Sequence, residues 1–203
     1  MNQAQNYLLS ILRNKDTNRK TFRTTAYKLT QLLALKTLDH IKMKTVDIET
    51  TLAKTTGLAI TQRIVLVPIL RSGITMVEPF LDFFPDAFIG VVGLQRDEKT
   101  AQAHWYYENI PKLSKDDQII IVDPMIATGG TGFETLTMLQ KKNANLDTLL
   151  YISMVSAPEG INKIKNSFAN ITIITTSTDS HLNDKKFIIP GLGDFGDRYF
   201  GTE

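Results

Sequence analysis

Cysteine is absent from the 203-residue sequence, and tryptophan occurs only once. Without cysteine the chain cannot form disulfides, use a thiolate nucleophile, or bind zinc or iron–sulfur clusters through sulfur. Long apolar runs are also lacking, because the longest, Ile64–Leu70, is far shorter than the roughly 20 residues that cross a bilayer. The first residues lack the basic and then apolar order of a secretion signal. The sequence therefore predicts a cytoplasmic protein that does not enter membranes.

A large net charge is also missing, but the charges that are present are unevenly distributed. Residues 1–63 carry 11 Lys and Arg against 4 Asp and Glu, a net +7, whereas residues 64–203 carry 12 against 17, a net −5. A basic N-terminal part could bind an anion, RNA or a membrane surface. A solvated helix face has the same composition, and the lack of any block of five like charges favours this simpler reading.

The remaining composition is that of an ordinary globular chain, with 42% hydrophobic and 22% charged residues. Such a composition excludes a disordered chain, because enough apolar surface is available to form a core. The length favours a single domain that spans residues 1–203.

Apolar periodicity predicts an N-terminal helix and then alternating strands and helices. The helix is expected over Asp16–Lys42, with Asp16 or Thr17 as its cap, and a turn is expected near Gly57. Strands and helices are then expected in the order 64–70 (strand), 73–84 (helix), 87–94 (strand), 118–122 (strand), 130–142 (helix), 148–155 (strand), 158–168 (helix) and 171–176 (strand). This alternation predicts an α/β fold with a mainly parallel sheet flanked by helices.

One polar stretch, residues 96–117, interrupts the alternation and contains the aromatic cluster Trp105-Tyr106-Tyr107. Excursions of this length often form lids over an active site, but an ordinary β-hairpin explains the stretch equally well. The aromatic side chains could close over a ligand or fill a small satellite core.

The strongest chemical signal is the segment from Asp123 to Gly132, DPMIATGGTG, which follows the apolar run Ile119–Val122. A buried strand there ends in an acid, and a glycine-rich loop opens the next helix. Backbone amides at such a helix start bind anions, and the acid at the strand tip can accept hydrogen bonds from sugar hydroxyls. The segment lacks the Gly-Lys-Ser/Thr ending of a nucleoside-triphosphate loop. A purely structural strand-to-helix turn remains the alternative.

This segment resembles the loop of type I phosphoribosyltransferases that binds phosphoribosyl pyrophosphate (PRPP). Further stretches make the chain similar to the uracil phosphoribosyltransferases, and they are VLVPILRSG from Val65, VGLQRD from Val92, SAPEG from Ser156 and IIPGLGDFGDR from Ile188. The resemblance covers the chain from about Leu9 to its end and is most specific after Ile48. It implies a type I phosphoribosyltransferase-like fold with an N-terminal helix and a small C-terminal hood over the base.

The resemblance also implies the roles of individual residues. PRPP would be bound by Arg71, Arg96, Asp123, Pro124, Met125, Ile126, Ala127, Thr128, Gly129, Gly130, Thr131 and Asp194. The catalytic residues would be Arg71, Arg96 and Asp194, with both guanidinium groups facing the pyrophosphate. Mg²⁺ is the expected cofactor, held mainly by PRPP and not by a dedicated set of protein ligands.

Uracil would be bound by Ile188, Gly193, Asp194 and Phe195, mostly through backbone groups that complement its acceptor–donor–acceptor edge. Cytosine would leave buried groups unpaired, which gives selectivity. The expected activity is transfer of the phosphoribosyl group of PRPP to N1 of uracil, which gives UMP and pyrophosphate. A homodimer or larger homo-oligomer and activation by GTP also follow from the resemblance, whereas membrane and nucleic-acid partners are not expected.

The sequence departs from the family pattern in two places. The His-Pro pair that many members carry near the N-terminus is replaced by Asn2–Asn6, and Phe195 stands where many bacterial members have Ala. Two other functions remain open at this point. One is a regulator that keeps the fold and contacts RNA through the basic N-terminal part, and the other is a transferase for another base, such as a purine.

Overall fold

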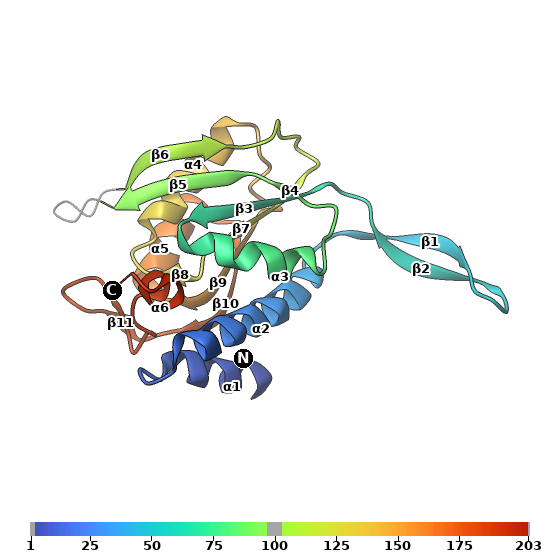
Figure 1. The fold of residues 1–203 in the computed structure, drawn as a ribbon. Helices are drawn as coiled ribbons and strands as arrows, with labels where there is room; N and C mark the ends of the chain where they lie inside the picture. The colour runs from blue at the N-terminus through green and yellow to red at the C-terminus, as the bar shows by residue number, and fades with distance from the viewer. Residues whose placement is uncertain (1–2, 97–102, 203) are drawn as a thin grey trace.

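The computed structural model describes residues 3–96 and 103–202, and the side chains of Arg96 and Ala103 lie outside the described part (Figure 1). Its centre is one sheet with the strand order β10-β9-β7-β3-β5-β6. The strands are β3 (Ile64–Leu70), β5 (Val91–Arg96), β6 (Ala103–Asn109), β7 (Gln118–Val122), β9 (Leu150–Ser156) and β10 (Thr172–Thr178). Neighbouring strands are parallel except β5 and β6, so the predicted mainly parallel sheet is confirmed.

Helices cover both faces of this sheet, as Figure 1 shows. One face carries α2 (Arg19–Leu38), the 3-10 helix η1 (Ser72–Met76) and α3 (Val77–Leu81), and the other carries α4 (Gly130–Lys141) and α5 (Pro158–Ser167). Short strands β4 (Phe88–Ile89) and β8 (Met125–Ile126) extend the sheet beside β3 and β9. Outside these layers lie α1 (Gln3–Arg13), the pair β11 (His181–Leu182) and β12 (Ile188–Ile189), and α6 (Phe195–Phe200).

Burial on both faces explains why the central strands are continuously apolar. In β7 every residue is buried, and Ile120 and Val122 pack toward α2. Ile119 and Ile121 pack toward α4. A strand buried on one face alone would alternate apolar and polar residues. The apolar runs therefore identified the centre of the sheet correctly.

Two predicted details near the N-terminus are wrong. The N-cap of α2 is Asn18, whose side chain accepts a hydrogen bond from the Thr21 amide at 2.9 Å. Thr17 belongs instead to the turn after α1, where its hydroxyl donates to the Ile11 carbonyl at 2.7 Å. Gly57 lies inside a strand and not at a turn, because it pairs with Val46 in the hairpin that follows α2.

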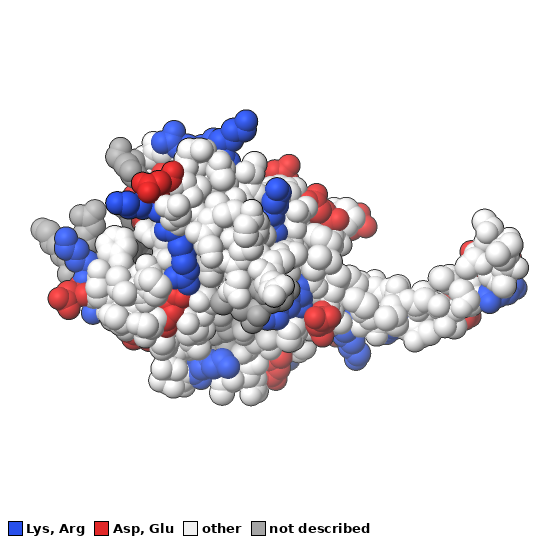
Figure 2. Space-filling view, turned by 90° about the horizontal axis from the view of Figure 1, so that it is seen from below, with Lys and Arg blue, Asp and Glu red and all other residues white. Residues whose placement is uncertain are grey.

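That hairpin, β1 (Met43–Glu49) and β2 (Lys54–Ile60), projects away from the rest of the molecule and is called the arm below (Figures 1 and 2). Its antiparallel strands are joined by a turn in which the Thr50 amide donates to the Ala53 carbonyl at 2.9 Å. Most of its side chains are exposed, whereas Ile60 at the base of the arm packs against the core. The sequence did not predict the arm, since its mixed polar composition gives no burial pattern.

Within residues 96–117 lies β6, which pairs antiparallel with the preceding strand β5, so the hairpin interpretation is confirmed for the described residues. Residues 97–102, which separate β5 from β6 in the sequence, lie outside the described part. No helix in the described ranges is both long enough and apolar enough to span a membrane.

Candidate active site

Asp123 stands directly after β7, at the carboxyl edge of the sheet. Its Oδ2 accepts a hydrogen bond from the Tyr151 hydroxyl at 3.2 Å, and its Oδ1 lies 3.5 Å from the Met125 amide. Burial raises the pKa of the Asp123 carboxyl to about 7, because these two hydrogen bonds only partly offset the desolvation. An ionised Asp123 is therefore short of hydrogen-bond donors, which hydroxyl groups of a ligand can supply.

Tyr151 is the residue that orients this carboxyl, and the sequence analysis did not find it. It lies in the buried strand β9, where burial and the neighbouring Asp123 raise the pKa of its hydroxyl well above its usual value. The hydroxyl therefore remains a donor. A Cβ on Gly132 would lie 2.5 Å from the Tyr151 ring, so glycine is needed where the tyrosine meets α4. A tyrosine within an apolar strand signals that a polar partner lies nearby, since a buried hydroxyl needs one.

The loop from Pro124 to Thr131 turns sharply into α4. Gly129 caps the helix with φ 72°, a left-handed conformation that favours glycine. The first amides of α4 have no partner inside the helix and, together with the positive end of the helix dipole, form a site suited to an anion. The hydroxyl of Thr128 sits beside them and lies 3.4 Å from the Gly130 amide. The loop thus has the glycine turn and the helix start that a phosphate site requires, and phosphate binding stays a prediction.

The same loop is pressed against the start of α5 through two glycines. A Cβ on Gly129 would lie 2.6 Å from the Gly160 carbonyl oxygen, and a Cβ on Gly160 would lie 2.3 Å from the Ala127 carbonyl oxygen. Neither distance is compatible with a side chain unless the backbone moves. The SAPEG segment therefore contributes Gly160 as a support for the loop, a role that the sequence analysis did not assign.

Arg71 follows β3 at the same edge of the sheet, and the peptide bond that precedes it is cis. Two residues later, a Cβ on Gly73 would lie 2.4 Å from the Val122 carbonyl oxygen, which shows how closely this turn approaches the end of β7. The Arg71 side chain is half exposed. Its Nη2 lies 3.1 Å from the Thr202 hydroxyl and 3.4 Å from an Asp197 carboxylate oxygen.

The C-terminal segment approaches Arg71 at the first turn of α6. Asp194 caps this helix by accepting a hydrogen bond from the Asp197 amide at 3.0 Å. Gly196 lies where the two segments meet, because a Cβ there would be 3.2 Å from an Asp194 carboxylate oxygen and 3.4 Å from Arg71 Nη2. The fold therefore brings together Arg71 and Asp194, which are far apart in the sequence. Gly196 is a further residue that the sequence analysis did not single out.

The other predicted base-binding residues have distinct environments. Ile188 is buried in β12, whereas Gly193 is exposed and has φ 80°. The Phe195 ring is buried against Phe22 of α2, with 5.3 Å between ring centroids. Only the backbone of Phe195 is therefore available to a ligand, and its side chain anchors α6 to the core.

Two further predicted elements belong to β5 and β6. Arg96 is the last residue of β5, and its side chain lies outside the described part. The aromatic cluster lies on β6, where the exposed fractions of Trp105, Tyr106 and Tyr107 are 37%, 58% and 46%. Of the two interpretations of this cluster, these exposed fractions do not support a satellite core, and closure over a ligand stays a prediction.

Comparison with known proteins places the whole chain in one family. A family model described as uracil phosphoribosyltransferase matches residues 2–202. Proteins named uracil phosphoribosyltransferase from Clostridium botulinum (strain Eklund 17B) and Limosilactobacillus reuteri (strain DSM 20016) are 41% and 38% identical to it over 196 residues, which is 96% of this chain and 93% of theirs.

Solved structures share the fold of this chain. The AQ2163 protein from Aquifex aeolicus is 32% identical and superposes with a TM-score of 0.92, covering 100% of this chain and 97% of that one. The hypoxanthine-guanine phosphoribosyltransferase of L. donovani shares the fold at 11% identity, with a TM-score of 0.51 over 79% of this chain and 81% of that one.

Proposed function

The chain belongs to the uracil phosphoribosyltransferase family, and from this premise we propose how its residues transfer the phosphoribosyl group of PRPP to N1 of uracil. The products are UMP and pyrophosphate. The observation that chiefly supports the proposal is the meeting of Arg71 and Asp194 around Gly196, beside the carboxyl end of β7 where Asp123 stands. A site for a sugar phosphate, a site for its leaving group and a site for a base are thus adjacent.

PRPP binds along the loop from Asp123 to Thr131. The first amides of α4 and the hydroxyls of Thr128 and Thr131 bind the 5-phosphate, which anchors the substrate away from the reacting carbon. Asp123 accepts hydrogen bonds from the ribose hydroxyls, and this is supported by the shortage of donors around its half-buried carboxyl. Anchoring at both ends aligns the anomeric carbon for attack.

Arg71 and Arg96 bind the pyrophosphate. The contacts of Arg71 with Asp197 and Thr202 are half exposed, and exposed pairs of this kind contribute only about 0–1 kcal/mol. A pyrophosphate group carries more charge than one carboxylate and therefore competes well for the guanidinium. Positive charge held in place before the reaction stabilises the departing anion without a cost of rearrangement.

Uracil binds to the backbone between Ile188 and Phe195, including Gly193 and Asp194. The burial of the Phe195 ring supports a role for the backbone in place of the side chain at that position. Backbone donors and acceptors in a fixed turn distinguish uracil from cytosine, because the wrong base leaves buried groups without partners.

Mg²⁺ fits the donor set of this site. Among the described residues, no group of three His, Asp or Glu side chains could hold a metal alone. The carboxylates of Asp123 and Asp194 are hard oxygen donors of the type that Mg²⁺ prefers, and Mg²⁺ commonly binds through one or two carboxylates together with substrate phosphates. When bound, Mg²⁺ would neutralise negative charge on the pyrophosphate.

In the transfer itself, the bond between the anomeric carbon and the pyrophosphate oxygen breaks and the bond to N1 of uracil forms. The electron pair of the breaking bond leaves with pyrophosphate, so positive charge develops on the ribose. Arg71 and Arg96 oppose the charge of the leaving group, while Asp123 holds the ribose in position. The N1 proton passes to Asp194, to water or to the pyrophosphate.

The proposal also covers the domain organisation, the cellular location and the oligomeric state of the protein. It folds as one phosphoribosyltransferase domain, and it acts in the cytoplasm, where phosphorylated substrates such as PRPP are retained. It forms a homodimer or larger homo-oligomer, which is supported by the exposed apolar side chains of Ile48, Leu52 and Leu58 on the arm. Light scattering measures the oligomeric state, and assays with added GTP test the predicted activation.

Product analysis with labelled bases tests the function directly. The wild-type protein is incubated with PRPP, Mg²⁺ and either uracil, cytosine, hypoxanthine, guanine or adenine. UMP and pyrophosphate from uracil alone are expected. Product from a purine would point to a different transferase. The absence of product with every base, despite PRPP binding, would favour a regulator.

Figure 2 gives that regulator little support, because Lys and Arg are interspersed with Asp and Glu on the face it shows.

A further inference from the structure

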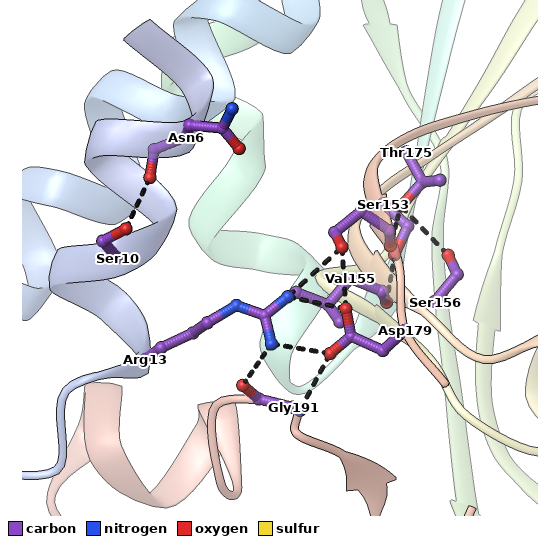
Figure 3. A network of polar contacts seen from close by, with 10 residues as sticks. Asn6, Ser10, Arg13, Ser153, Val155, Ser156, Thr175, Asp179 and Gly191 are labelled. Carbon is purple, nitrogen blue, oxygen red and sulfur yellow. Dashed lines mark hydrogen bonds and ion pairs between the residues drawn. The ribbon is translucent and has the colours of Figure 1, made fainter. Parts of the chain in front are cut away.

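A shielded ion pair links the N-terminal helix to the segment that precedes the base-binding residues. Arg13 is the last residue of α1, and Asp179 follows β10. The guanidinium donates from Nη2 to Asp179 Oδ1 at 2.6 Å and from Nη1 to Oδ2 at 2.8 Å (Figure 3). The side chains are 24% and 2% exposed, respectively. Two parallel, charge-assisted hydrogen bonds in a shielded place fix direction as well as distance.

The same pair binds both backbone groups of Gly191, three residues before Asp194. The Gly191 amide donates to Asp179 Oδ2 at 2.8 Å, and its carbonyl accepts from Arg13 Nη1 at 3.1 Å. Gly191 has φ 59°, and a Cβ there would lie 2.2 Å from the Ile188 carbonyl oxygen. The turn that leads into the base-binding backbone is therefore held in one orientation by the Arg13–Asp179 pair.

Ser177 completes the network around the carboxylate. Its hydroxyl donates to Asp179 Oδ1 at 2.7 Å, and Arg13 Nη2 lies 3.2 Å from the same hydroxyl. Each carboxylate oxygen thus accepts two hydrogen bonds. Burial raises the pKa of Asp179, but the hydrogen bonds from Arg13, Ser177 and Gly191 outweigh it, so the pKa is lowered. Asp179 therefore stays ionised at neutral pH.

We propose that Arg13 and Asp179 are positioning residues for base recognition, which fix the turn at Gly191 so that the backbone from Gly193 to Phe195 meets uracil. This inference rests on the proposed function. The loop that binds PRPP has a separate support, the contact of Gly129 with Gly160, which shares no residue with this network. Loss of the pair should therefore weaken recognition of the base much more than binding of PRPP, which meets this segment only at Asp194.

The main test is the substitution Arg13→Met, which keeps most of the side-chain length and removes the guanidinium. We expect KM for uracil to rise about ten- to a hundredfold, because small displacements of a binding group have effects of this size. KM for PRPP should stay within about twofold, and discrimination against cytosine should fall. Arg13→Lys, which keeps the charge but loses the paired geometry, should have an intermediate effect.

A matched control is available in the pair of Arg63 and Asp117 at the opposite end of β3. Arg63 also binds an aspartate through two nitrogens, with Nε to Oδ1 at 2.9 Å, and the side chains are 34% and 4% exposed. Arg63→Met removes the same type of interaction far from the carboxyl edge of the sheet. It should lower the melting temperature as much as Arg13→Met does and leave both KM values unchanged.

The outcomes separate the inference from the proposed function. An unchanged KM for uracil in a folded Arg13→Met protein would overturn the inference, and so would an equal rise of both KM values. If Arg13→Met does not fold, Arg13→Lys decides by the same two criteria. Wild-type protein that forms no UMP would refute the proposed function and the inference with it, whereas an active wild type with an unaffected Arg13 variant refutes the inference alone.

Discussion

The two halves of the candidate site are supported in different ways. The loop from Asp123 to Thr131 is fixed by close backbone approaches, in which Gly129 and Gly160 lie too near their neighbours for any side chain. The C-terminal segment is fixed by side chains from the N-terminal helices, with Arg13 binding Gly191 and Phe22 packing on Phe195. Single substitutions cannot remove a phosphate site that is formed by the backbone. A base pocket that is supported by distant side chains can be altered by substituting one of those side chains at a time.

Arg198 belongs to the second type of support. Its guanidinium donates to the carbonyls of Leu192 and Asn14, each at 2.7 Å, and to the carbonyl of Leu12. The guanidinium also lies 4.4 Å from the centroid of the Phe22 ring. It therefore joins the end of α1 to the turn before Asp194. Two arginines from different helices thus hold a single short turn.

The largest expected effect comes from removing the apolar anchor of the C-terminal segment. Phe195→Ala should lower the free energy of unfolding by about 3–5 kcal/mol, because a fully buried ring leaves a cavity between α2 and α6. Chemical denaturation measures the loss, and steady-state assays should show a larger rise in KM for uracil than in KM for PRPP. Phe195→Leu is the control and should lose less. Equal changes in both KM values would show that the two halves are not independently supported.

Arg71 lies between the two halves, and its removal should affect turnover more than stability. Arg71→Ala should lower kcat by a factor of about ten to a thousand, because a charge that stabilises the departing pyrophosphate is lost. Its half-exposed contacts with Asp197 and Thr202 contribute little to folding, so the melting temperature should hardly change. A folded and fully active variant would show that Arg71 does not face the pyrophosphate.

The contrast between the halves also explains what the sequence could predict. The strand, acid and glycine-rich loop from Ile119 to Gly132 are contiguous, so their order alone indicated a phosphate site on an α/β sheet. The resemblance added Arg71 and Asp194. The contacts Arg13–Gly191 and Phe22–Phe195 join residues more than 170 positions apart, and no local pattern encodes such pairs. The arm was missed for another reason, since exposed strands carry no burial pattern.

A smaller effect is expected from disturbing the backbone support of the phosphate loop. Gly160→Ala should cost about 1–3 kcal/mol of stability, because its Cβ would lie 2.3 Å from the Ala127 carbonyl oxygen and the loop must move. KM for PRPP should rise about tenfold while KM for uracil changes little, the reverse of the Phe195→Ala pattern. Gly130→Ala is a control for the loss of stability alone, since a Cβ there has only ordinary contacts with protein atoms. Similar KM values for Gly160→Ala and the wild type would remove Gly160 from the support of the loop.

The smallest predicted effect concerns the charge of Asp123. Its pKa is raised from 3.8 to about 7 in the folded protein, so the folded state binds the proton more tightly than the unfolded state does. The stabilisation from this proton is present below about pH 4 and is lost as the pH rises to about 7. The full shift corresponds to about 4 kcal/mol, and the part of the carboxyl open to solvent reduces the expected loss to about 1–2 kcal/mol.

Asp123→Asn cannot ionise, so its stability relative to the wild type should increase between pH 4 and pH 7 and stay constant above, as measured by urea unfolding. Saturating PRPP should reduce this difference, because ribose hydroxyls supply donors to the ionised carboxylate. If the difference does not depend on pH, the carboxylate is already well solvated and is not reserved for a ligand.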